Sequence, residues 1–185
     1  MNVKKDHFSL ILLSTVLALS LVSINFCTKI SSCALFYTIA TISVFQISTI
    51  VPRRQTIYIL STTILLSLII SFNQEYRIAS KTIEHLVPVS LFSILLSSLF
   101  SLSVFARLYS RFNFTLAAMS AILLSTAIDG CIMSVLLINY FSIKSVLTAF
   151  ISEVGYKLLY CGSFCIIRAF TLACRRFIFS NKTSI

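Results

Sequence analysis

The sequence predicts an all-α polytopic membrane protein, with six transmembrane helices and both termini in the cytoplasm. Of its 185 residues, 58% are hydrophobic and 11% are charged, and the mean hydropathy is +0.99. A soluble domain is usually about 45–50% apolar and about 25% charged. Six apolar stretches each approach or exceed the length of about 20 residues that a helix needs to cross a bilayer. The length suits a single six-helix transmembrane domain over residues 1–185.

Polar breaks separate the six stretches and set their order. The breaks are CTKISS, PRRQ, NQEYRIASKTIEH, RLYSRFN and FSIKS. All but the third are short, so consecutive helices are expected to be antiparallel neighbours. Lys4 and Lys5 before the first apolar run also fit a signal peptide, but no persuasive cleavage site follows, so we expect this helix to remain. The predicted helices are 8–26, 33–51, 56–72, 86–106, 114–140 and 146–170.

The basic residues predict the orientation. Most of the 15 lysines and arginines fall on one side of the predicted bundle: Lys4, Lys5, Arg53, Arg54, Arg107, Arg111, Arg168, Arg175, Arg176 and Lys182. The other side holds Lys29, Arg77, Lys81 and Lys144. The positive-inside rule then places both termini in the cytoplasm, and we expect a multi-pass protein of the cell (inner) membrane. The net charge of +10 does not indicate nucleic acid, because these residues sit at helix ends and form no stripe.

Three charged residues lie inside the last two apolar stretches. They are Asp129, Glu153 and Lys157. A charge in hydrocarbon costs roughly 2.5–3.5 kcal/mol on insertion scales, so such groups usually face a bundle interior or a wet cavity. At ~1.5 Å rise per residue, the short turn between the two helices brings all three near one level. Glu153 and Lys157 are also four apart, which favours an ion pair. We predict that the three meet and bind a solute; the alternative is a buried ion pair that fixes helix register.

Other polar or small residues can contribute to the same site. Asn25 and Gln46 lie within or near apolar runs, and either can reach the cavity or hydrogen-bond a neighbouring helix. Gly130 and Gly155 adjoin the charges, where glycine permits close approach of backbone or ligand. Gly162 suits helix packing equally well.

The chain carries no motif for catalysis, a metal or a cofactor. There is no HExxH, P-loop or GxGxxG sequence and no evident Ser-His-Asp set, so no enzyme activity is predicted. The six cysteines show no zinc-ligand spacing. Cys161 and Cys165 share a helix face as small hydrophobes, whereas Cys27 and Cys33 flank one loop and can pair.

The C-terminal half resembles the queuosine precursor transporters, also called the VUT family. The resemblance rests on STAIDGCIMSVLLINYF, which carries Asp129, and on EVGYK in the last helix, which carries Glu153 and Lys157. Asn25 followed by Lys29, and SVFARLYSR with Phe105 and Arg107, resemble the ends of the family's first and fourth helices. The family usually has a second-helix Asp, where this chain has Gln46 or Ser48.

The resemblance implies import of a 7-deazaguanine or of the queuine base. A carboxylate suits the paired N–H groups of a guanine-like edge, so Asp129 or Glu153 is expected to bind it, with Lys157 tuning the charge. Two other readings stay open: a substrate-binding membrane subunit of an ATP-driven vitamin-type importer, and a non-transporting structural membrane protein. The partners expected are a deazapurine and the lipid bilayer, and the sequence leaves a homo-oligomer open.

Overall fold

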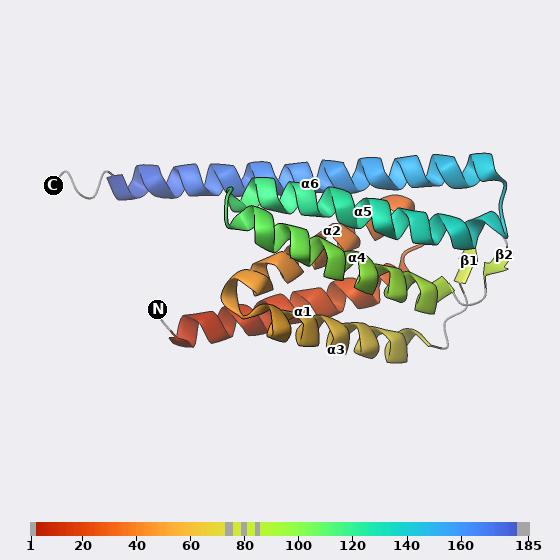
Figure 1. Cartoon of the computed structure of the whole chain (residues 1–185), viewed down its shortest axis with the longest axis horizontal. Helices are drawn as coiled ribbons and strands as arrows, with labels where there is room; N and C mark the ends of the chain where they lie inside the picture. The colour runs from red at the N-terminus through yellow and green to blue at the C-terminus, as the bar shows by residue number, and fades with distance from the viewer. Residues whose placement is uncertain (1–2, 73–75, 79–80, 84–85, 181–185) are drawn as a thin grey trace.

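Six long helices make up almost all of the described structure (Figure 1). The computed structural model describes residues 3–72, 76–78, 81–83 and 86–180. Each of the six described helices is long and apolar enough to cross a membrane, so the chain is an all-α multi-pass membrane protein, as predicted. The helices are α1 (Val3–Phe26), α2 (Ile30–Ile50), α3 (Arg53–Ser71), α4 (Leu86–Tyr109), α5 (Phe114–Ile138) and α6 (Ile143–Ser180).

The helix ends follow from local sequence. Val51 has an extended backbone and Pro52 is the N-cap of α3, so a proline separates two helices with almost no loop. The last span, predicted at 146–170, agrees with the apolar part of α6, Ile143–Arg168, but the helix itself is longer. It runs to Ser180 and extends beyond the rest of the bundle (Figure 1). Residues 171–180 contain neither proline nor glycine, and nothing in them ends a helix.

A short hairpin occupies the one long connection, which the sequence predicted only as a polar break. Strand β1 (Tyr76–Ile78) pairs antiparallel with β2 (Lys81–Ile83). Three-residue strands are too short for their periodicity to be recognised in sequence. Figure 1 shows the hairpin at the end of the bundle opposite both chain termini. We call that end the outer end, and the end that holds Val3 and Ser180 the inner end.

The described basic residues divide between the two ends as predicted. Arg53 begins α3 and Arg107 lies in the last turn of α4, both at the inner end, whereas Lys29 and Lys144 lie at the outer end. Arg54, Arg111 and Arg168 lie at the inner end as well. The side chains of the other basic residues used for the orientation lie outside the described part of the structure: Lys4, Lys5, Arg77, Lys81, Arg175, Arg176 and Lys182.

Helix packing places α2 at the centre of the bundle. It packs against α1 and, across the bundle, against α6, while α5 packs against both α4 and α6. Helix α3 packs mainly on α1 and α4, although the chain enters it directly from α2. Small residues let α4 and α5 approach closely. Those that are buried there are Ser93, Ser97, Ser98 and Ser101 on α4, and Ala117, Ala118 and Ala121 on α5.

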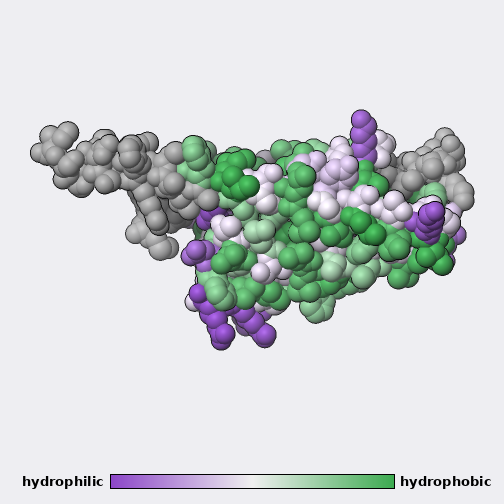
Figure 2. All heavy atoms as spheres, turned by 90° about the horizontal axis from the view of Figure 1, so that it is seen from above, coloured by the Kyte–Doolittle hydropathy of each residue, from purple (hydrophilic) through white to green (hydrophobic). Residues whose placement is uncertain are grey.

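The outer faces of the helices are apolar. Phe92 and Phe100 on α4 and Ile166 on α6 are each more than half exposed. The face seen in Figure 2 is mostly hydrophobic, with hydrophilic residues mainly towards its two ends. A surface of this kind is suited to lipid, with the polar ends in the interfacial regions.

Candidate functional site

A cavity of about 490 Å³ extends from the outer loops into the bundle. Near the outer end it is lined by Cys27 and Thr28 after α1, by Phe141 between α5 and α6, and by Ser145 in the first turn of α6. Its deeper lining includes Tyr37, which lies seven residues, or ~10 Å, along α2 from Ile30. Five helices, α1, α2, α4, α5 and α6, therefore contribute to its walls.

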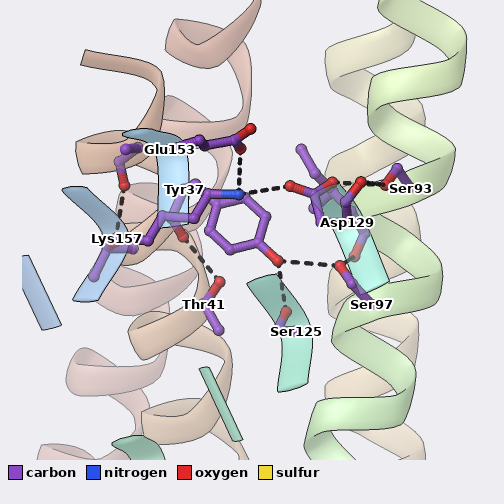
Figure 3. Close-up of polar contacts among 11 residues, drawn as sticks. Tyr37, Thr41, Ser93, Ser97, Ser125, Asp129, Glu153 and Lys157 are labelled. Atoms are coloured by element: carbon purple, nitrogen blue, oxygen red, sulfur yellow. Dashed lines mark hydrogen bonds and ion pairs between the residues drawn. The ribbon is translucent and has the colours of Figure 1, made fainter. Parts of the chain in front are cut away.

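The three charged side chains meet at this cavity (Figure 3). Lys157 Nζ lies 2.6 Å from Asp129 Oδ2 and 2.5 Å from Glu153 Oε1. The prediction that they meet is thus confirmed, because α5 and α6 are antiparallel and bring the three residues to one level. Lys157 is 1% exposed, so the two carboxylates, and not water, stabilise its positive charge.

The two carboxylates differ in how far they are enclosed. Asp129 accepts a 2.6 Å hydrogen bond from Ser93 Oγ on Oδ1, while Oδ2 faces Lys157, so both oxygens are engaged. Its side chain is 6% exposed, whereas that of Glu153 is 25% exposed. Both residues line the cavity. Glu153 is therefore the more accessible carboxylate of the cavity, and Asp129 is the more enclosed partner of Lys157.

Tyr37 completes the site and was missed by the sequence analysis. Lys157 Nζ lies 3.5 Å from the centroid of its ring, a cation–π contact worth roughly 0.5–2 kcal/mol. Its hydroxyl hydrogen-bonds with Ser97 at 3.2 Å and Ser125 at 2.6 Å, so one side chain connects α2, α4, α5 and α6 (Figure 3). The available signal was a tyrosine inside an apolar run, where a buried hydroxyl usually finds a partner.

The other predicted polar residues have different positions. Asn25 lines the cavity and also donates two hydrogen bonds to α3, to Ser67 Oγ at 3.1 Å and Ser71 Oγ at 3.0 Å. Both interpretations of Asn25 are therefore correct. Gln46 is not part of the described cavity lining. It lies nine residues, or ~14 Å, beyond Tyr37 towards the inner end, so the expectation that it can reach the cavity was wrong.

The glycines near the charges act in packing more than in solute contact. A Cβ on Gly130 would lie within 2.1 Å of the Phe150 ring, so this glycine allows α6 to approach α5 beside the ion pair. A Cβ at Gly155 or Gly162 would meet nothing within 4 Å. The expectation that Gly155 belongs to the site was wrong, because it faces away from the cavity.

Four of the six cysteines fall into two groups. Cys161 and Cys165 are both buried on one face of α6, as predicted. Cys27 and Cys33 both line the cavity near its outer end, where Cys33 Sγ lies 3.6 Å from the Cys27 carbonyl oxygen. Burial raises the pKa of the Cys27 thiol. These two residues are therefore natural reporters of access to the cavity.

Comparison with known proteins gave no identification. The chain matches no protein-family model, no curated protein and no solved structure. The interpretation of the site therefore rests on its residues and their geometry.

Proposed function

We propose that this protein imports a small solute across the cell inner membrane, and that the solute is a queuosine precursor of the 7-deazaguanine type or the queuine base. The observation that supports this most strongly is the cavity itself, which ends on an ion-paired Asp129–Lys157–Glu153 cluster. With both termini in the cytoplasm, the cavity faces the outside of the cell, where an importer must collect its solute.

The size and lining of the cavity support a small planar solute. A volume of about 490 Å³ lies within the usual range of roughly 300–1,000 Å³ for small-molecule sites. The walls are largely apolar and include Leu86, Val87 and Met133, with polar side chains both nearer the outer end and deeper, where Tyr37 and the two carboxylates lie. This arrangement suits a flat ring system that has one edge rich in hydrogen-bond donors.

The charges support a solute with paired N–H groups. The cluster carries one lysine and two carboxylates, so its net charge is negative when all three are ionised. An ionised carboxylate only accepts hydrogen bonds, and charge-assisted bonds are stronger than neutral ones. Glu153 is the accessible acceptor, so we assign to it the guanine-like edge, with Asp129 and Tyr37 holding Lys157 beside it.

The structural alternative accounts for less of the geometry. An ion pair that only fixes helix register needs neither a cavity of this size nor a carboxylate that remains 25% exposed inside it. The substrate-binding subunit of an ATP-driven importer needs the same cavity. Co-purification of an energising module would distinguish that assembly from a transporter that works alone.

Uptake in cells tests the proposal. The chain is expressed in cells that cannot make queuosine precursors, and each deazaguanine or queuine is supplied in turn, with queuosine in tRNA as the readout. We expect modification with at least one compound and its loss in Glu153→Gln. Asp6→Asn, which removes a carboxylate before the first span, is the matched control and should retain uptake. Full uptake in Glu153→Gln at normal membrane levels would contradict the assigned role.

A further inference from the structure

An aromatic cluster fills the inner end of the bundle. Phe45 of α2 stacks on Phe105 of α4, with ring centroids 4.5 Å apart and planes 3° from parallel. Phe105 also stacks on Tyr109 at 5.3 Å, and both rings meet the edge of Phe114 of α5. Phe45, Phe105 and Phe114 are all buried. Three helices are thus joined at this level by ring contacts.

Arg168 adds the fourth helix to this cluster. Its guanidinium carbon lies 3.6 Å from the centroid of Phe114, so the cation of α6 covers the face of that ring. Within the described part of the chain, Arg168 Nη1 is buried and has no hydrogen-bond partner. The contact with the Phe114 ring is one interaction by which Arg168 holds α6 against the cluster.

This cluster separates the cavity from the inner end. Along α6, Cys161 lies ~6 Å and Arg168 ~16 Å beyond Lys157 towards the inner end. Along α2, Phe45 lies ~12 Å beyond Tyr37. The described cavity lining reaches Tyr37 and Asp129 and includes none of the cluster residues. Cys161 therefore lies between the level of the ion pair in the cavity and the level of the rings.

We propose that Phe45, Phe105, Tyr109 and Phe114 form the inner gate of the transport path, and that Arg168 is the latch that keeps it closed. The inference rests on the proposed transport function, but not on which solute is carried. The cluster suits a gate because its contacts join separate helices through rings alone and are neither covalent nor ion-paired. A small shift of α6 that lifts Arg168 from Phe114 would free one side of the cluster.

A cysteine of the chain itself reports on this gate. Cys161 is 1% exposed and lies between the cavity and the rings, so it is protected while the gate is closed. A version that keeps Cys161 and replaces the other five cysteines by alanine is placed in inverted membrane vesicles and treated with a membrane-impermeant maleimide. The reagent then reaches the protein from the inner side only, and the labelling rate of Cys161 is measured.

Loss of the latch or of the central ring should expose Cys161. We expect Arg168→Ala and Phe105→Ala each to raise the labelling rate about tenfold, because each removes a contact that links neighbouring helices. Arg107→Ala and Phe100→Ala are the matched controls, since both residues are exposed on α4, and they should leave the rate unchanged.

The outcomes separate this inference from the proposed function. Each variant is first shown to be monodisperse, with a melting temperature close to that of the parent. Unchanged labelling in folded Arg168→Ala and Phe105→Ala, or an equal rise in the control variants, would overturn the gate. Increased labelling confined to the gate variants, in a protein that carries no queuosine precursor, would retain the gate and reject only the solute.

Discussion

Replacement of Lys157 by methionine tests the energetic basis of the site. The change preserves most of the side-chain length but removes the cation that lies 2.6 Å from Asp129 and 2.5 Å from Glu153. Removing one partner of a buried pair costs about 3–5 kcal/mol, because the other charge stays buried and uncompensated. Glu153 is partly exposed, so we expect the lower part of this range, about 3 kcal/mol.

A double-mutant cycle separates the pair from its surroundings. Asp129→Asn leaves Lys157 with only Glu153, and the double variant Asp129→Asn/Lys157→Met leaves only the partly exposed carboxylate of Glu153 at this position. We expect the double variant to be less destabilised than the sum of the single changes by about 2 kcal/mol. Lys144→Met, at an exposed position at the start of α6, is the matched control and should change stability by less than about 0.5 kcal/mol.

The free energy of unfolding is measured in mixed micelles by titration with a denaturing detergent, followed by circular dichroism. The reasoning is refuted if Lys157→Met is no more destabilising than Lys144→Met. It is also refuted if the effects of Asp129→Asn and Lys157→Met simply add, since the contact would then contribute nothing of its own.

Three further predictions follow from individual contacts. Gly130→Ala should lower stability by about 1–3 kcal/mol, because the new Cβ would overlap the Phe150 ring. Gly155→Ala, where a Cβ meets nothing within 4 Å, should be neutral or stabilising by up to about 1 kcal/mol. Thermal melting of the two variants tests this difference. Tyr37→Phe removes two hydroxyl contacts and should lower the free energy of unfolding by about 1 kcal/mol. Tyr37→Leu also loses the cation–π contact with Lys157 and should lower it further. Equal free energies of unfolding for the two variants would contradict the ring's role. The raised pKa of Cys27 gives it a smaller thiolate fraction at neutral pH than an ordinary cysteine has. Maleimide labelling of a variant that keeps only Cys27 should therefore be slow at neutral pH, and its rate should still increase at alkaline pH. A labelling rate that levels off at the pH expected for a free thiol would show that the cavity mouth is open to water.

The sequence predicted the number of spans and the meeting of the charges for a clear physical reason. Hydrocarbon demands long apolar helices and penalises unpaired charge, so both features are visible in composition and spacing. Asp129 and Lys157 were found because a short turn joins their helices and their depths can be counted from it. Once the depths agree, the cost of an unpaired charge in hydrocarbon favours the helix faces that bring the two residues together.

The remaining features depend on helix rotation, which sequence alone does not give. Tyr37 and Ser93 belong to helices far from α6 in sequence, and their contacts require α2 and α4 to present particular faces to the pair. Gln46 was misassigned for a related reason. It resembles Asn25 in polarity, but it lies at another depth, on the far side of Tyr37 from the cavity. The aromatic cluster likewise joins Phe45 to residues on three other helices.

Direct binding to the purified protein tests the central claim, that the ion-paired cluster in the cavity is a solute site. Radiolabelled queuine, and then each 7-deazaguanine, is titrated against the protein in lipid nanodiscs, with Glu153→Gln and Asp6→Asn measured alongside. The account predicts saturable binding to the parent and to Asp6→Asn. It predicts a Kd at least about tenfold weaker in Glu153→Gln, as expected for loss of a charge-assisted hydrogen bond. Equal affinity in Glu153→Gln, or no binding of any of these compounds to the folded parent protein, would contradict it.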